Sequence, residues 1–344
     1  GCMKSYNPRS LDEFITLQAS LPAQTQILSG GTDWIIAHRR KAEDLPALLW
    51  IGGIPDLKRI AIDDQGQLHI GACCTMAALE QSDLLRGAFR VIAEAAASVG
   101  STQIRNRATI GGNIANASPA ADLAAPLIAL NASAHILREG AVFDLPVSEL
   151  ITGAEKTVLR PLDILLGFTL PAFPKEAESH YYKLGSREQL SISRFGVAMV
   201  LRRTQGLVEQ ANIAIGAIGA KAVRMPELER ALIGRRVDTS SADALGDLCE
   251  REVSLADQTL CLADAQRREI ALGERVIDGH GKAALAYFLT DGMRDTEFFR
   301  KQDAPGIGGP PEQRLPFPVP RENPGAVGRQ QTADAQVAAD RHKA

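Results

Sequence analysis

The chain has 344 residues, of which 45% are hydrophobic and 23% are charged, so it is long enough for two domains with a sizeable core. Its formal net charge of −3 and the lack of a Lys/Arg cluster interleaved with aromatic residues argue against nucleic-acid binding. No uninterrupted apolar run approaches the ~20 residues needed to cross a bilayer, so we expect no membrane span.

Cysteine and histidine usage predicts a protein without a metal site of its own. The five cysteines form no C-x-x-C pair, and this odd number without a framework spacing predicts reduced thiols in a cytoplasmic setting. An iron–sulfur cluster would need about four closely spaced thiolates, which the sequence lacks. The six histidines show no H-E-x-x-H or similar spacing. No acid–base pair or nucleophile with a partner histidine emerges either, so we predict no catalytic residue.

The chain opens with a helix, a strand, a glycine turn and a second helix. Ser10-Leu-Asp-Glu13 has the form of a capping box and predicts a helix over residues 11–20. A short strand over 26–28 leads to Ser29-Gly-Gly-Thr-Asp33 and a helix over 34–40. This order can seat a phosphate on main-chain amides at a positive helix end, although a structural turn explains the same residues. The segment matches neither G-x-G-x-x-G nor G-x-x-x-x-G-K-[ST], which argues against a Rossmann or P-loop site.

Alternating and helical patterns continue through the first hundred residues. We expect strands over 48–51, 60–62 and 68–70, the last two forming a hairpin, and helices over 75–80 and 88–99. The second of these helices is rich in alanine and carries Val91, Ile92 and Ala95 at helical spacing. That spacing is typical of a helix that faces the core rather than of a chemical site.

The most distinctive stretch runs from Gly100 to Leu123 and reads GSTQIRNRATIGGNIANASPAADL. It combines Gly111 and Gly112 with asparagines and hydroxyl side chains, and a single carboxylate, Asp122, precedes an apolar run. We predict a loop that ends at a helix start and holds an anionic ligand through main-chain N–H groups, since glycine permits close backbone approach. An ordinary loop with a capped helix behind it accounts for the composition equally well.

The remaining residues predict a second domain and a tail. The first domain is expected to end with a helix over 123–130 and strands over 134–137, 142–145 and 164–170, and a linker over 171–179 follows. In the second domain we expect opening segments over 181–187 and 192–201, a strand over 211–218, and helices over 226–233, 241–254 and 264–278. An antiparallel sheet backed by helices fits this order. From Asp303 onward, seven of the eighteen prolines and a polar stretch predict a tail that is mobile or ordered only on a partner.

Several positions of the stretch 100–123 follow one longer pattern, namely Ile104–Asn106, Thr109–Asn113, Ser118, Pro119 and Asp122. Together they resemble the flavin-binding signature of the molybdenum hydroxylase family, IRN-x-(A/G)-T-(I/L)-G-G-N-(I/L)-x-x-(A/G)-S-P-x-(A/S)-D. The family includes xanthine dehydrogenase, aldehyde oxidase and the carbon monoxide dehydrogenase flavoprotein. Its FAD domains carry a second motif earlier in the chain, (A/S)-G-G-T-D, which Ser29–Asp33 resembles in the same order.

Shorter stretches of the sequence resemble other motifs of the same family. Ile70-Gly-Ala72 with Thr75 resembles its I-G-A-x-x-T stretch, and the strand over 164–170 is similar to a family strand that contacts the cofactor near Leu165. Lys183 stands where the family has a lysine close to the flavin, and Arg187 follows in the K-x-x-x-R spacing. A solvated face at the end of a strand is an alternative reading of this lysine and arginine.

The resemblance implies an α+β protein. Its first part would be a two-subdomain FAD-binding fold of the vanillyl-alcohol-oxidase/xanthine-dehydrogenase type, and a smaller C-terminal domain of antiparallel sheet plus helices would follow. The implied boundaries are residues 3–173 for the FAD-binding domain, 178–300 for the C-terminal flavoprotein domain and 303–344 for the mobile tail.

The resemblance also implies that this chain binds FAD. The implied cofactor-binding residues are Ile27, Leu28, Ser29, Gly30, Gly31, Thr32, Asp33, Trp34, Val99, Gly100, Thr109, Ile110, Gly111, Gly112, Asn113, Ser118, Asp122, Leu165 and Lys183. Main-chain amides of 29–33 and 110–113, with the hydroxyls of Thr32, Thr109 and Ser118, would cradle the pyrophosphate and ribityl chain. Asp122 would accept from a ribityl or ribose hydroxyl, and Asn113 would donate to phosphate or ring.

By the same resemblance, FAD would work within a multi-subunit enzyme. A molybdopterin-binding large subunit would hydroxylate a purine, an N-heterocycle or an aldehyde, and a small subunit would carry two [2Fe–2S] clusters. Electrons would pass through those clusters to the flavin and leave it for NAD⁺, oxygen or another acceptor. This chain does not identify the substrate, because the pocket that selects it would lie on another chain.

Two other functions stay open at this point. A stand-alone flavin oxidoreductase on the same fold would be expected to bring an acid–base set for its own substrate, and none is found. An assembly protein that kept the fold but lost the flavin would not need the intact glycine pairs at 30–31 and 111–112.

Overall fold

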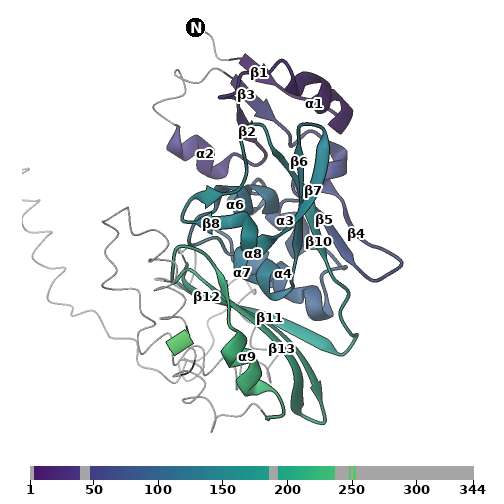
Figure 1. Cartoon of the computed structure of the whole chain (residues 1–344), viewed down its shortest axis with the longest axis vertical. Coiled ribbons are helices and arrows are strands. Elements are labelled where there is room, and N and C mark those ends of the chain that lie inside the picture. The colour runs from purple at the N-terminus through teal and green to yellow at the C-terminus, as the bar shows by residue number, and fades with distance from the viewer. Residues whose placement is uncertain (1–3, 39–46, 186–192, 237–247, 249–250, 253–344) are drawn as a thin grey trace, which may run out of the picture. The chain divides into compact units, whose positions relative to one another are not determined.

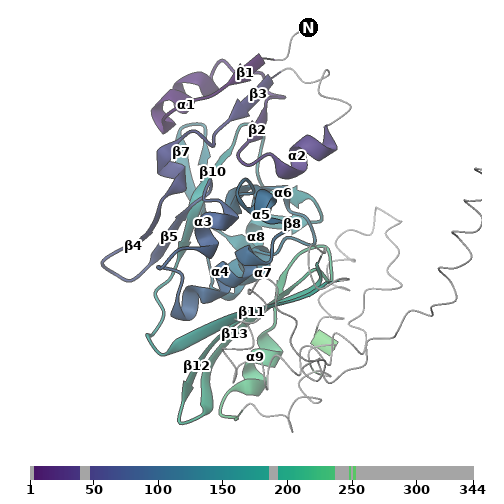
Figure 2. The same ribbon diagram turned by 180° about the vertical axis from the view of Figure 1, so that it is seen from behind.

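The computed structural model describes residues 4–38, 47–185, 193–236, 248 and 251–252. These residues form an α+β fold, as predicted, with sheets of three, five and four strands, a two-stranded ribbon and short helices (Figures 1 and 2).

A small parallel sheet carries the first glycine motif. Its strands lie in the order β1-β3-β2, with β1 at Lys4–Tyr6, β3 at Ala47–Trp50 and β2 at Gln26–Leu28. Helix α1 (Leu11–Gln18) begins where the Ser10 hydroxyl accepts a hydrogen bond from the Glu13 amide, as the capping pattern predicts. Helix α2 (Thr32–Ala37) follows β2 and begins two residues before the predicted start, because Thr32 and Asp33 already have helical geometry.

A five-stranded antiparallel sheet forms the centre of the first part. Its order is β4-β5-β10-β6-β7, with β4 at Ile60–Ile62, β5 at Leu68–Gly71, β10 at Ile164–Leu170, β6 at Ser133–Arg138 and β7 at Ala141–Pro146. The predicted β4–β5 hairpin is confirmed by its antiparallel pairing, and the neighbouring strands β6 and β7 pair in the same way.

Short helices pack against this sheet and supply most of the core. They are the 3-10 helices η2 (Pro55–Lys58) and η3 (Gly87–Phe89), and helices α3 (Met76–Glu80), α4 (Arg90–Ala97), α5 (Thr102–Arg105), α6 (Ile110–Asn116), α7 (Ala124–Ala129) and α8 (Val147–Leu150). The ribbon of β8 (Ile151–Gly153) and β9 (Lys156–Thr157) follows α8. Fully buried Phe168 of β10 lies in the same core as Ile92 of α4 and Leu127 of α7.

A four-stranded antiparallel sheet covers the other side of α4 and α7. Its strands β11 (Ala177–Gly185), β12 (Ser193–Thr204), β13 (Leu207–Gly216) and β14 (Val223–Arg224) lie in sequence order, and α9 (Pro226–Leu232) packs on β13. Helix α4 contacts β11, and α7 contacts β12 and β13. The buried Asn212 amide donates to the Ala129 carbonyl at the end of α7 at 2.9 Å. This packing brings the end of β11 and the start of β12 beside the segment that precedes α7.

Two local predictions are wrong. The stretch 100–123 is not a loop, since it contains α5 and α6, which begin after the capping hydroxyls of Ser101 and Thr109. Strand β11 begins inside the predicted linker 171–179. Arg187, the helix predicted over 264–278 and the tail 303–344 lie outside the described residues, as do most residues of the helix predicted over 241–254.

Candidate functional site

The two glycine motifs of the sequence lie against each other. The hydroxyl oxygens of Ser29 and Thr109 are 2.7 Å apart and share a hydrogen bond, although the residues are 80 positions apart. A Cβ atom at Gly30 would overlap the main-chain carbonyl of Arg107, so this approach requires glycine. The indole of Trp50 donates to the Ser29 carbonyl at 2.9 Å and fixes the turn from the side of β3. The two motifs are therefore in direct contact.

The first motif presents donors that the protein itself does not use. Gly31 has a φ of 74°, a left-handed conformation that turns the chain from β2 into α2. The amides of Gly31, Thr32 and Asp33 donate to no acceptor among the described residues. The Trp34 indole Nε1 is buried and also has no described partner, although its ring stacks on His38. The first amides of a helix have no partner within the helix, and a buried donor such as the Trp34 indole is normally paired, so this turn suits a ligand that supplies acceptor atoms.

The amides at the start of α6 are, by contrast, occupied by the protein. The Ile110 amide donates to the Cys74 carbonyl at 3.0 Å, and the Gly111 amide donates to the Ala72 carbonyl at 2.8 Å. A Cβ atom at Gly111 would stand 2.6 Å from the Ala72 methyl group, so α6 packs directly on the turn after β5.

The next two amides of α6 have partners within the helix start. The Gly112 amide donates to the Thr109 hydroxyl at 3.1 Å, and the Asn113 amide donates to the Thr109 carbonyl at 2.9 Å. The cradle of main-chain N–H groups predicted over 110–113 would therefore have to share donors that the protein already uses. The physical reason is that these donors are needed to start α6 and to attach it to the turn after β5.

The polar side chains after α6 also bond within the protein. The Asn113 side-chain oxygen accepts from the Leu123 amide at 3.3 Å, and the Ser118 hydroxyl accepts from the Ala120 amide at 3.3 Å. These bonds shape the segment that carries Asp122 into α7.

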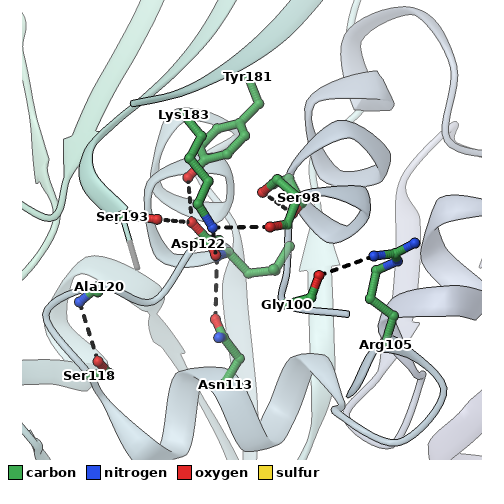
Figure 3. A network of polar contacts seen from close by, with 12 residues as sticks. Ser98, Gly100, Arg105, Asn113, Ser118, Ala120, Asp122, Tyr181, Lys183 and Ser193 are labelled. Atoms are coloured by element: carbon green, nitrogen blue, oxygen red, sulfur yellow. Dashed lines mark hydrogen bonds and ion pairs between the residues drawn. The ribbon is translucent and has the colours of Figure 1, made fainter. Parts of the chain in front are cut away.

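Asp122 is the centre of a buried polar cluster (Figure 3). Its Oδ1 accepts from the Tyr181 hydroxyl at 2.9 Å and from the Ser193 hydroxyl at 2.5 Å. Its Oδ2 accepts from the Lys183 ammonium at 2.9 Å, and that ammonium also donates to the Ser98 carbonyl at 3.0 Å. The acceptor role predicted for Asp122 toward a flavin hydroxyl must therefore share this carboxylate with three protein donors.

Burial controls the protonation of the groups around the site. Burial, and then the charge of Asp122, raises the pKa of the Tyr181 phenol well above its ordinary value near 10, so the phenol remains a donor. Burial also raises the pKa of Cys73 to about 12 and that of Cys74 to about 11. These raised pKa values disfavour the thiolate at neutral pH, so neither thiol is an activated nucleophile.

The remaining predicted residues lie around these two groups. Ile27 and Leu28 form β2, and Val99 and Gly100 follow α4, where the Gly100 carbonyl accepts from Arg105 at 3.3 Å. The Leu165 side chain is 5% exposed and packs in the core, so a contact between Leu165 and the cofactor would be made by its backbone.

Sequence reasoning missed three residues that shape the site: Trp50, Tyr181 and Ser193. Tyr181 had a usable signal, because it lies two positions before Lys183 and so faces the same side of a strand. Ser193 had none, because it reaches Asp122 only through the pairing of β12 with β11.

No helix in the described ranges is long and apolar enough to cross a membrane. No group of three His, Cys, Asp or Glu side chains in the described part of the chain could hold a metal ion.

Two family models match the chain. The FAD binding domain in molybdopterin dehydrogenase matches residues 1–173, and the CO dehydrogenase flavoprotein C-terminal domain matches residues 180–273.

Individual proteins are similar over most of their length. The xanthine dehydrogenase FAD-binding subunit of Escherichia coli O157:H7 is 28% identical over 246 residues, which cover 71% of this chain and 84% of that one. The structure of carbon monoxide dehydrogenase from Hydrogenophaga pseudoflava gives a TM-score of 0.66 at 25% identity, covering 76% of this chain and 95% of the matched chain. Quinoline 2-oxidoreductase from Pseudomonas putida 86 shares the fold, with a TM-score of 0.67 at 21% identity over 77% of this chain and 98% of the matched chain.

Proposed function

This chain belongs to the family of FAD-binding domains of molybdopterin dehydrogenases, and we propose that it is the FAD-bearing electron-transfer subunit of a multi-subunit molybdenum hydroxylase. The similar proteins are subunits of dehydrogenases, so the chain is a component of an oxidoreductase. FAD, when bound, supplies the redox chemistry, and the protein supplies binding, orientation and electrostatics.

The observation that carries the proposal is the open turn of the first motif, held in place by the second. The amides of 31–33 have no acceptor among the described residues, the buried Trp34 indole N–H has no described partner, and a backbone contact at Gly30 leaves no room for a side chain. A pyrophosphate has the acceptor oxygens that such donors require, and a turn of successive N–H groups is a general anion-binding arrangement.

We assign direct contacts with the cofactor mainly to the first motif and a structural role to the second. The amides of 31–33 and the Thr32 hydroxyl would bind the pyrophosphate, while Thr109, Gly111 and Gly112 would act by holding α6 beside the turn. The other residues predicted from the family signature keep their place in the proposal, with Asp122 and Lys183 at the far end of α6. We keep the functional domains at 3–173 and 178–300, and the tail as a separate segment.

The proposal includes partners because the described chain lacks the groups that would feed the flavin. Both described cysteines are buried and protonated, so [2Fe–2S] clusters would come from a small subunit and the molybdopterin from a large subunit. Free thiols also favour a cytoplasmic location. We propose a purine, an N-heterocycle or an aldehyde as the substrate of the complex, and NAD⁺ or another acceptor for its electrons.

An absorption spectrum of the purified full chain, before and after incubation with FAD, tests the proposal. We expect flavin bands at roughly one flavin per chain, and anaerobic addition of NADH should bleach them if NAD⁺ is the acceptor. Flavin without bleaching would favour oxygen, a quinone or another acceptor. A chain that takes up no FAD would overturn the proposal and favour the assembly function.

A further inference from the structure

The cluster around Asp122 joins three separate segments of the chain. Asp122 precedes α7, Tyr181 and Lys183 lie on β11, and Ser193 begins β12 (Figure 3). The side chains of Asp122 and Lys183 are only 9% and 14% exposed. A buried ion pair is favourable only when further hydrogen bonds satisfy both partners, so the surrounding groups determine whether this pair holds one geometry.

Counting donors and acceptors shows which positions the cluster leaves open. An ammonium has three hydrogens, and Lys183 uses two of them, on Asp122 and Ser98. A carboxylate has about four acceptor positions, and Asp122 uses three, for Tyr181, Ser193 and Lys183. Within the described residues, one hydrogen of Lys183 and one acceptor position on Oδ2 of Asp122 have no partner. The pair can therefore contact a ligand without breaking its existing bonds.

The sequence makes room for the phenol that holds this carboxylate. A Cβ atom at Gly196 would stand 2.7 Å from the Tyr181 hydroxyl, so a larger residue on β12 would displace it from Asp122. Tyr181 is 6% exposed, and its raised pKa keeps the hydroxyl protonated. Ser193 approaches the same oxygen from the neighbouring strand. Two neutral donors on one carboxylate oxygen orient the carboxylate without cancelling its charge.

We propose that Tyr181 and Ser193 are positioning residues for the flavin: they fix Asp122, and through it they fix the Lys183 ammonium at the cofactor. This inference rests on the proposed function, because the cofactor is the group on which the lysine charge would act. Reduction adds negative charge to a flavin, so a fixed ammonium nearby raises its reduction potential and a nearby carboxylate lowers it. The four-stranded sheet would in this way adjust the reduction potential of a cofactor whose pyrophosphate binds to the first part of the chain.

The test uses the full chain reconstituted with FAD and three measurements: the dissociation constant for FAD, the midpoint reduction potential of the bound flavin and the thermal unfolding temperature. Lys183→Met should lower the potential, and Asp122→Asn should raise it. Tyr181→Phe and Ser193→Ala should both lower it, because Asp122 is then less firmly oriented and the Lys183 ammonium is no longer fixed at the cofactor. Each of these two variants should weaken FAD binding by up to about tenfold, because the Asp122–Lys183 pair is then less fixed for its contact with the cofactor.

Ser179→Ala is the matched control. Ser179 is a buried serine on β11 that bonds to Val91 and to the Gly87 carbonyl, at 2.9 and 3.0 Å, instead of to Asp122. This variant should lower the unfolding temperature and leave the potential unchanged. Gly196→Ala keeps both hydroxyls and should reproduce the potential shift of Tyr181→Phe.

The possible results separate the two proposals. A wild-type chain that binds no FAD overturns the proposed function and this inference with it. A wild-type chain that binds FAD, with potentials in Tyr181→Phe and Ser193→Ala equal to the wild-type value, overturns this inference alone. If Tyr181→Phe does not fold, Ser193→Ala decides the question, since removal of a small hydroxyl leaves the packing of the aromatic ring intact.

Discussion

The two glycine motifs look alike in sequence, but their main-chain amides differ in the structure: those of the first lack described acceptors, and those of the second are bonded within the protein. In the first, Gly31 turns the chain and leaves the amides of 31–33 without described acceptors. In the second, the amides of Ile110 and Gly111 are bonded to the turn after β5. The carboxylate that ends the second motif, Asp122, is likewise surrounded by protein donors.

The difference shows that two physical reasons can each require glycine in a binding motif. Glycine in the first motif exposes donors to a ligand, whereas Gly111 in the second lets a helix approach a neighbouring turn. A substitution in the first motif should therefore change cofactor binding more than stability. A substitution in the second should lower stability first and affect the cofactor through the displaced structure.

The largest effect is expected for Gly111→Ala. The added methyl group would stand 2.6 Å from the Ala72 methyl and 2.7 Å from the Ala72 carbonyl oxygen, so α6 must move. Overpacking of this kind should lower the free energy of unfolding by about 3 kcal/mol. Urea denaturation of the FAD-free chain measures it, because the comparison concerns stability without cofactor.

Gly153→Ala serves as its control, since a Cβ there would meet only the Lys156 side chain at 3.8 Å. It should change the denaturation midpoint much less. Equal midpoints for Gly111→Ala and the wild type would contradict the structural role assigned to the second motif.

Thr109→Val should have the next largest effect, because one hydroxyl has two functions. It accepts from the Gly112 amide as the cap of α6, and it bonds to Ser29 at 2.7 Å. Loss of a cap and of a hydrogen bond should together cost about 2 kcal/mol. Thr75→Val is the matched comparison, because Thr75 caps α3 through the Ala78 amide. It should cost about 1 kcal/mol, and equal losses for the two variants would show that the contact between the motifs contributes nothing.

The Tyr181 phenol, which donates to Asp122 at the end of the second motif, should make the stability of the protein depend on pH. Its pKa is raised in the folded state, so its stabilising contribution is fully present below the unfolded value near 10 and is lost as the pH rises further. Each pH unit above 10 should cost about 1.4 kcal/mol from this group. Denaturation between pH 9 and 11 measures the slope, and Tyr181→Phe should reduce the alkaline loss. If both proteins lose stability in parallel, the Tyr181 phenol does not have the raised pKa that its burial beside Asp122 implies.

Much of this fold could be predicted from local patterns. Strands over 26–28, 60–62 and 164–170 were predicted at their observed positions, because their alternating or apolar runs are bounded by glycine, proline or charged turns. The segment 100–123 was misread because capping hydroxyls and glycines mark loops and helix starts alike. Such residues do not reveal where their amides will donate.

The candidate site could be predicted only in part, because a local sequence pattern identifies residues but not the partners of their polar groups. Motif spacing identified Ser29 and Thr109, and the resemblance identified Asp122 and Lys183. Their arrangement depends on contacts over long sequence distances, such as the bond from Ser193 to Asp122 across 71 positions. No local pattern records such a pairing, so the occupation of the Asp122 carboxylate had to be seen in three dimensions.

The two tryptophans of the chain give the comparison with the smallest expected change in stability. Trp34→Phe removes an indole N–H that has no described partner, so the free energy of unfolding should change by less than about 0.5 kcal/mol. FAD binding should weaken about fivefold if that N–H donates to the cofactor. Trp50→Phe removes the donor to the Ser29 carbonyl and should cost about 1 kcal/mol of stability. Calorimetric titration with FAD and denaturation of both variants would separate a ligand donor from a structural one. Unchanged FAD affinity in Trp34→Phe would place the open donors of the first motif outside the cofactor site.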